Sequence, residues 1–433
     1  MENLDYARLQ MAFTLGFHII FACIGMVMPF FMIVAHSRWL KTRNPVYLKL
    51  TKAWLRGVAI FFVTGAVSGT ALSFELGLLW PEFMKRAGPI IGMPFSLEGA
   101  AFFVEAIALG FYLYGWKNLP EKFHWFTGVI IGLAGVLSGI LVVAANGWMN
   151  APTGFDYNNG VFSNIDPVAA LLNPAWFSQA LHMTLAAFVA TSFGVAGIHA
   201  FQILRGKAVE VHQKAFKIAL FFGAIAAILQ PISGDISAKD IAERQPAKLA
   251  AMEAHFKTEK GAPLFLGGVV DEENQEVNYK VEIPNALSFL AFGDFDAEVK
   301  GLNEFPKDEI PPVAIVHYSF QIMVGIGTLL ALAGLIYFIS LKKKSWMNSK
   351  KYWWFYMLLA PLGFLALEAG WVVTEVGRQP WIIYQVMKTS EAVTPMPGMK
   401  FSFYMYLGVY FLLGTTVTWL MARQIKALNT QKD

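Results

Sequence analysis

Nine apolar stretches, each long enough to cross a bilayer as a helix, dominate this chain of 433 residues. A spanning helix needs about 20 mostly apolar residues, and runs of this length are typical of transmembrane helices. We expect the spans near residues 12–35, 54–80, 94–116, 124–146, 176–204, 214–233, 313–340, 353–377 and 402–424. The sequence therefore predicts an all-α integral membrane protein with nine transmembrane helices.

Composition supports this class and excludes several others. Hydrophobic residues make up 56% of the chain and charged residues only 15%, compared with about 25% charged residues in an ordinary soluble domain. The single cysteine, Cys23, excludes an internal disulfide framework. The net charge of +4 is small and no basic cluster is interleaved with aromatic residues, so we expect no nucleic-acid partner.

Lysine and arginine gather in alternate links between the spans. They include Arg38 and Lys41 after the first span and Lys342 and Lys343 after the seventh, whereas residues 147–175 contain none. Positive charge marks the cytoplasmic side of a membrane protein. We therefore expect the N-terminus outside and the C-terminus in the cytoplasm.

A polar, mainly acidic segment over residues 234–312 separates two apolar parts, residues 1–233 and 313–433. Within it, residues 238–257 have the pattern of one amphipathic helix. A long link of this kind is either a solvated insertion or a lid and docking surface, and its composition favours neither.

Three residues that can bind iron lie within the spans. His18 and His182 are each about 9 Å below the expected outer start of a span, and Met323 is in the outer half of the seventh. A lone histidine is most often a hydrogen-bonded core residue, but histidine and methionine together suit low-spin haem iron. Zinc or copper is less favoured, because no cysteine or second histidine stands at metal spacing. His317 is a rival to Met323, and the two cannot share a helix face.

Carboxylates also fall within the spans, and we expect them in the outer half of the membrane. Glu98 is expected to open the third span, with Glu105 seven residues deeper on the same face. They either pair with basic or backbone groups, or they form a proton relay. Glu375 is a relay member or an oxygen ligand to iron, and Arg378 beside it can hold a propionate. Trp371, on the same face as Glu375, can pack against a macrocycle.

Several short motifs, taken in order and spacing, resemble those of one family. They are Arg8-Leu9-Gln10 followed by His18, Glu98-Gly99, Asn146-Gly147-Trp148-Met149 and Gly377-Arg378-Gln379-Pro380-Trp381. Over essentially the whole chain, this pattern is similar to subunit I of cytochrome bd-type quinol oxidases. The short polar segment favours its cyanide-insensitive branch.

The resemblance implies a set of haem ligands. His182 and Met323 match the axial ligands of a low-spin haem b, and His18 matches the ligand of one high-spin haem. Glu375 matches the ligand of the other. One high-spin haem is of b type and the other is haem d or a further haem b, and their assignment to His18 and Glu375 stays open. Trp371 matches the aromatic residue between the haems.

The resemblance also implies how the protein works. Glu98 and Glu105 match acidic residues that deliver protons, and Lys248 and Glu253 match polar contacts to quinol. Quinol is oxidised at the outer face of the bacterial inner membrane, and O₂ is reduced to water in the respiratory chain, which contributes to the proton motive force. The expected partners are subunit II, a small third subunit and membrane lipid.

Two other functions compete with this interpretation. A haem-bearing anchor would pass electrons from quinol to another protein, and a secondary transporter would show internal repeats, which we do not see in the sequence. The chain also departs from the family at Gln321, where many members carry arginine. The missing charge is expected to lower the potential of the low-spin haem.

Overall fold

The computed structural model describes residues 3–158 and 160–430, and nine helices in these ranges are long and apolar enough to cross a membrane. They are α1 (Asn3–Thr42), α2 (Pro45–Leu79), α3 (Pro81–Tyr114), α4 (Glu121–Asn150), α6 (Trp176–Leu204), α7 (Val209–Arg244), α10 (Val313–Lys342), the α11–α12 pair (Lys350–Leu359 and Leu362–Val376) and α14 (Met399–Thr430). The predicted fold class is confirmed. The break between α11 and α12 comes at Pro361, which has no backbone N–H to continue the helix.

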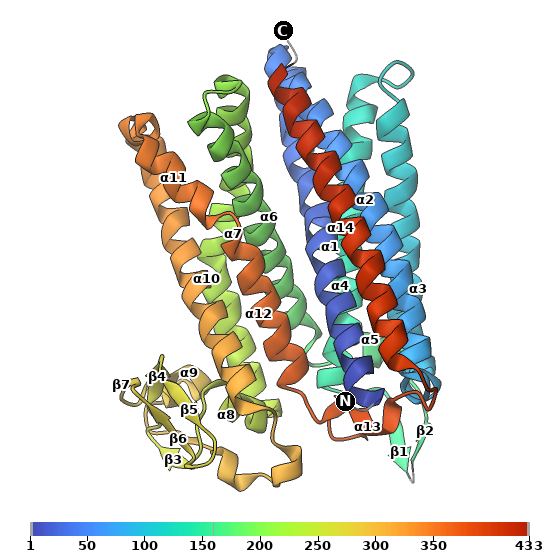
Figure 1. The fold of residues 1–433 in the computed structure, drawn as a ribbon, viewed down its shortest axis with the longest axis vertical. Coiled ribbons are helices and arrows are strands. Elements are labelled where there is room, and N and C mark those ends of the chain that lie inside the picture. Colours follow the sequence, from blue (N-terminus) through green and yellow to red (C-terminus); the bar gives the residue numbers. More distant parts are fainter. Residues whose placement is uncertain (1–2, 159, 431–433) are drawn as a thin grey trace.

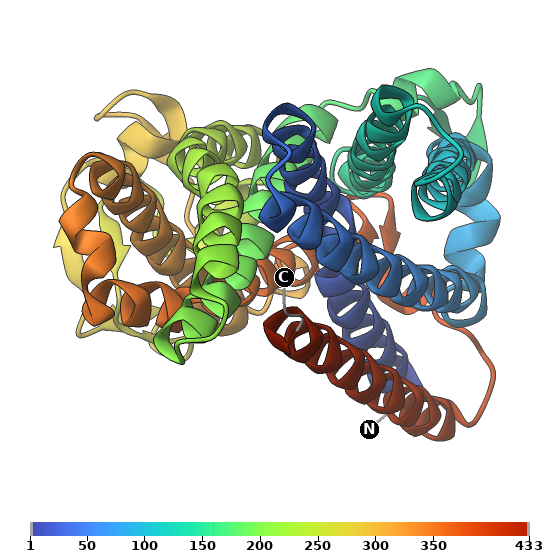
Figure 2. The same ribbon diagram turned by 90° about the horizontal axis from the view of Figure 1, so that it is seen from above.

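The helices stand side by side in two groups (Figure 1). One group holds α6, α7, α10, α11 and α12, and the other holds α1 to α4 and α14, as the view from above also shows (Figure 2). Helix α6 contacts both α1 and α4, so it joins the two groups. Side chains such as Phe103, Phe401 and Phe411 are 67–77% exposed, as expected for faces covered by lipid.

Small residues bring the helices close together in the core. Alanines such as Ala190 on α6 and Ala219 on α7 are fully buried. A Cβ atom added to Gly363 would lie 2.6 Å from the Cα atom of Ala190, so α12 approaches α6 more closely than any side chain would allow. Close backbone approach of this kind is how membrane helices gain packing energy.

The short elements gather at one end of the bundle, which we call the loop end (Figure 1). The short helices are α5 (Pro167–Leu171), α8 (Pro246–Met252), α9 (Ala286–Phe292) and α13 (Thr389–Ala392), with 3-10 turns at Leu302–Glu304 and Lys307–Glu309; a third 3-10 turn, Lys344–Asn348, follows α10. The strands are β1 (Asp156–Asn158), β2 (Val161–Ser163), β3 (Glu259–Lys260), β4 (Leu264–Leu266), β5 (Val269–Asp271), β6 (Glu276–Asn278), β7 (Val281–Ile283), β8 (Glu298–Val299), β9 (Trp381–Ile383) and β10 (Met387–Lys388). They form antiparallel pairs, and β4 pairs with β7 with Phe265 opposite Glu282.

Two expectations about helix boundaries are wrong. Helix α3 begins at Pro81 and continues through Pro89 and Pro94. Glu98 therefore lies in the interior of the helix and not at its start. The single helix expected over residues 238–257 is instead the end of α7 followed by α8, with Gln245 between them. Pro246 stands at the start of α8, where the missing N–H of proline leaves no helix hydrogen bond unmade.

Candidate functional site

The ring of His182 on α6 is held by a serine and a glycine of α7. The Ser233 hydroxyl donates to the carbonyl of Gln230 (2.9 Å), so its oxygen is left to accept from Nδ1 of His182 at 3.0 Å. This fixes the proton on Nδ1 and leaves the lone pair on Nε2, the nitrogen that can bind iron. In this structure the Gln230 amide donates to Nε2 at 3.1 Å. The ring lies over Gly234, where an added Cβ atom would be 3.6 Å from Cε1.

The ring of His18 on α1 is held in the same way by α2. The Ser68 hydroxyl donates to the carbonyl of Thr64 (2.8 Å) and lies 2.9 Å from Nδ1 of His18. A Cβ atom added to Gly69 would be 3.0 Å from Cε1 of His18. We call each arrangement a Ser–Gly cradle: Ser68–Gly69 for His18 and Ser233–Gly234 for His182. The histidine and serine are 50 residues apart in one cradle and 51 in the other.

A cavity of about 390 Å³ brings His182 and Met323 together. Its wall also includes Trp371 and Gly370 of α12, and a Cβ atom added to Gly370 would lie 3.0 Å from the Met323 sulfur. The glycine therefore makes room for the thioether. The rival His317 is fully buried and bonds through Nδ1 to the carbonyl of Met252 at 2.8 Å, and it does not line this cavity.

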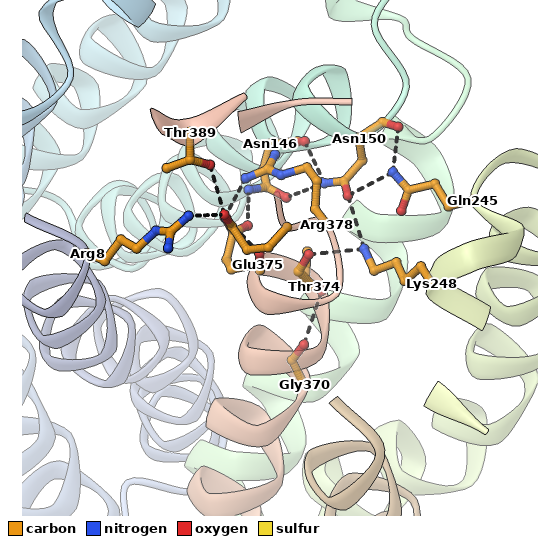
Figure 3. A network of polar contacts seen from close by, with 11 residues as sticks. Arg8, Asn146, Asn150, Gln245, Lys248, Gly370, Thr374, Glu375, Arg378 and Thr389 are labelled. Atoms are coloured by element: carbon orange, nitrogen blue, oxygen red, sulfur yellow. Dashed lines mark hydrogen bonds and ion pairs between the residues drawn. The ribbon is translucent and has the colours of Figure 1, made fainter. Parts of the chain in front are cut away.

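The half-buried Glu375 and the buried Arg378 form an ion pair at the loop end of α12 (Figure 3). Oε1 of Glu375 accepts from Asn146 at 2.5 Å and Oε2 accepts from Arg378 at 2.6 Å. Arg378 is only 2% exposed, yet its Nε and Nη1 atoms have no partner in the protein. Two unpaired donors on one buried guanidinium fit an anion such as a carboxylate.

Lys248 of α8 reaches the same region from the other side (Figure 3). Its Nζ donates to Oδ1 of Asn150 (3.1 Å) and to the carbonyl of Thr374 (3.0 Å). Burial, with help from the charge of Arg378, lowers the pKa of Lys248 to about 7, against the opposing effect of Glu375. The amine is therefore close to losing its charge at neutral pH.

Glu253 follows α8 and, like Lys248, lines the cavity. Its Oε2 atom is buried without a hydrogen-bond partner. Burial raises the pKa of Glu253 to about 8. The cavity therefore joins two titratable residues at the loop end to His182 and Met323.

Glu98 and Glu105 lie between α3 and α4, apart from this cavity. Ser138 donates to Glu98 at 2.9 Å, and a Cβ atom on Gly135 would be 3.5 Å from Oε2 of Glu105. The two carboxylates do share a helix face, as expected. Glu98 is, however, about 25 Å along α3 from Pro81, so the expectation that it lies at the end of this helix is wrong.

The structure adds polar residues that the sequence analysis missed. Asn146 and Asn150 bind the ionic groups, and Ser68 and Ser233 orient the histidines. Glu368 is a buried carboxylate on the same face of α12 as Trp371, with Oε1 unpaired and Oε2 beside Gly16 of α1. Two features of the sequence could have pointed to these residues. One is a carboxylate inside an apolar span, and the other is a Ser-Gly pair in each of two spans.

Comparison with known proteins gives consistent matches along the chain. The profile of the family described as cytochrome bd terminal oxidase subunit I matches residues 6–429. The putative cytochrome bd menaquinol oxidase subunit I of Bacillus subtilis is 36% identical over 100% of this chain and 99% of its own length. The cytochrome bd ubiquinol oxidase subunit 1 of the same organism is 33% identical, over 98% and 94%. The structure of bd oxidase from Geobacillus thermodenitrificans superimposes with a TM-score of 0.93 at 36% identity, covering 98% of this chain and 99% of that one.

Proposed function

This chain belongs to the family of cytochrome bd terminal oxidase subunits I, and on that premise we propose that it is the haem-carrying subunit of a quinol:oxygen oxidoreductase. It is a multi-pass protein of the bacterial inner membrane. The observation that carries the proposal is the pair of Ser–Gly cradles, of which only the His182 cradle opens on a cavity shared with Met323.

The residues of the cavity fit a haem. His182 offers Nε2, Met323 offers a thioether, and glycines clear the wall beside both. Arg378 does not line this cavity, but it is nearby at the loop end of α12, and its unpaired donors suit a propionate. When bound, haem supplies the one-electron and oxygen chemistry that amino-acid side chains lack.

The ligands divide into two classes. His182 and Met323 would hold a low-spin haem b, since two protein ligands would fill the iron, and the soft thioether would raise its reduction potential. His18 and Glu375 each hold a high-spin haem, one of b type and the other haem d or a further haem b. Trp371 packs between them, and hydrogen bonds from Asn146 and Arg378 hold the Glu375 carboxylate in place.

Quinol is oxidised at the loop end, which faces the outside. A hydroquinone gives up its hydroxyl protons as it loses electrons, so a buried base must take them. The Glu253 carboxylate, unpaired in the wall of the cavity, takes a proton and releases it outward. Lys248 orients a quinol oxygen by donating a hydrogen bond.

Protons for water formation come from the cytoplasmic side. Glu105 and Glu98, stacked on one face of α3, hold these protons between α3 and α4. Chemical protons are thereby taken up and released on opposite sides, which contributes to the proton motive force. Subunit II, which membership of the subunit I family implies, and a small third subunit cover part of the exposed apolar surface, and lipid covers the rest.

Carbon monoxide distinguishes an oxidase from a haem-bearing electron-transfer anchor. The purified complex is reduced with quinol, and spectra are recorded with and without CO. We expect oxygen consumption with quinol and a CO response, because oxygen reduction needs an open iron position. A coloured protein without a CO response would support the anchor, and a colourless one would support a transporter.

A further inference from the structure

The segment after α8 is hydrogen-bonded to helix α10 of the bundle, and its helix α9 packs against α7. The backbone N–H of Val270 donates to the hydroxyl of Tyr318 at 2.9 Å, and the N–H of Ala314 donates to Glu272 at 3.0 Å. Both contacts join the first turns of α10 to the β4–β7 region. The segment is therefore not a free insertion, since side chains on both partners hold it against the helix.

Gln321 makes a further contact that uses both ends of its amide. Its Nε2 donates to the carbonyl of Phe265 (2.9 Å), and its Oε1 accepts from the N–H of Gly267 (3.3 Å). These two backbone groups point the same way from one edge of β4, and β7 pairs with the other edge. The amide thus occupies the place of a neighbouring strand. Neither a carboxylate nor an apolar side chain can make both bonds.

Gln321 and Met323 point in different directions from α10. Two residues turn a helix by about 200°, so Met323 faces the His182 cavity while Gln321 faces β4. The same loop segment carries α9, whose Leu287 and Leu290 line that cavity. The loop segment therefore contacts α10 through β4 at Gln321, and it reaches the cavity of Met323 through α9.

We propose that Gln321 is a positioning residue: by clamping the edge of β4 to α10, it keeps the quinol-side wall and the Met323 thioether in one rigid frame. This inference rests on the proposed function for the roles of quinol and Met323. Gln321 thus has a role of its own, in addition to the missing positive charge that the sequence analysis noted at this position. The loop segment cannot shift away from the bundle without releasing the amide.

The test uses Gln321→Met, which has a similar shape and loses both bonds, in the whole purified complex. We expect the KM for quinol to rise roughly threefold to tenfold, as for one or two lost neutral hydrogen bonds, while kcat changes little. The midpoint potential of the low-spin haem should fall, because a less firmly held thioether favours reduced iron less. Limited proteolysis within residues 253–312 should become faster.

Three further variants make the result specific. Gln424→Met makes the same chemical change on α14, far from the loop segment, and should match wild type in every measurement. Tyr318→Phe removes one loop contact without touching the β4 edge, so it should speed proteolysis and leave the potential unchanged. Gln321→Asn is too short to reach β4, and it replaces Gln321→Met if that variant does not assemble.

Unchanged proteolysis, potential and KM in the Gln321 variant would overturn the clamp. If wild type itself oxidises no quinol, the proposed function fails instead, and the proteolysis comparison still decides whether Gln321 holds the loop segment.

Discussion

His18 and His182 are held by the same serine and glycine arrangement, but the residues on the other side of the two rings differ. Each ring is fixed by a serine hydroxyl on the next spanning helix and lies over the adjacent glycine. His182, however, shares a cavity with Met323 and Trp371, whereas the ring contacts that the structure gives for His18 come from α2. The serine sets the tautomer of each ring, and the glycine makes room for it. The side chains on the other side of the ring determine whether a second ligand, such as the Met323 sulfur, is available.

On the proposed ligand assignment, this difference would let one chain hold iron for electron transfer at His182 and iron for oxygen chemistry at His18. A haem with two protein ligands has no vacant position, and a haem with one has a position for O₂. The tertiary position of a single thioether is therefore the feature that separates the two sites. Each of the following predictions tests whether the two histidine sites differ in this way.

The largest effect is expected from removing each histidine in turn. His182→Ala should abolish the low-spin signal in the reduced-minus-oxidised spectrum and keep the CO response. His18→Ala should keep the low-spin signal and roughly halve the CO response, because on the proposed assignment the Glu375 site also has one protein ligand. His317→Ala should keep both signals, since that ring bonds to a backbone carbonyl and lies outside the cavity. A low-spin signal that survives in His182→Ala would show that the ligand assignment is wrong.

Met323→Leu should convert the His182 site into one resembling the His18 site. Leucine is close in volume and has no sulfur, so the cavity should persist while one axial ligand is lost. The low-spin spectrum should become high-spin, and the CO response should rise by about half, because a third iron position opens beside those proposed at His18 and Glu375. Met405→Leu, on the exposed face of α14, is the matched control and should change neither. No new CO response would mean that Met323 is not a ligand.

Replacing the cradle serines tests whether they act alike. Ser233→Ala and Ser68→Ala leave Nδ1 without its acceptor, so haem should be held roughly 10- to 100-fold less tightly at the affected site. Haem content per complex after dilution measures this loss, and each variant should affect only its own signal. Ser96→Ala removes a serine that bonds only within its own helix, and its haem content should equal that of wild type. Equal loss from both sites in either variant would argue against two independent cradles.

The smallest effect concerns pH and should appear only on the electron-entry side. Glu253 has a pKa of about 8 and is therefore mostly protonated at lower pH. Well below that pKa, the fraction in the carboxylate form, which can accept a proton, increases roughly tenfold for each pH unit. The rate at which quinol reduces the low-spin haem should rise about fivefold from pH 7 to pH 8 and level off above about pH 9. Lys248, with a pKa of about 7, loses its charge over the start of this range.

Two comparisons check the pH effect. Glu253→Gln should remove the rise, while Gln275→Glu, a change in an exposed turn of the same segment, should leave it in place. The CO response of the open site should be the same at every pH in this range. A rise that persists in Glu253→Gln would assign the base to another residue.

The prediction from sequence was most accurate where hydropathy alone decides the structure. The span expected at 176–204 coincides with α6, and all nine spans form helices in the described residues. It failed for Glu98, because prolines that usually end a helix lie inside α3. The positions of His182 and Met323 on different spans were recognised, but the cavity that unites them could not be derived from residues that are far apart in the chain.

The cradles show the same limit in finer detail. Ser68 and Ser233 look like ordinary helix residues in the sequence, and no internal repeat was recognised there. The equivalence emerges only when α2 packs on α1 and α7 packs on α6.

The sequence by itself determined that this chain is a nine-helix membrane protein, because the cost of placing polar backbone in lipid leaves apolar segments of this length little choice but to be helices. Only the tertiary structure decided which side chains meet. Hydrogen bonds and ligand sets act over a few ångströms, and packing of helices distant in the chain brings their atoms within that range.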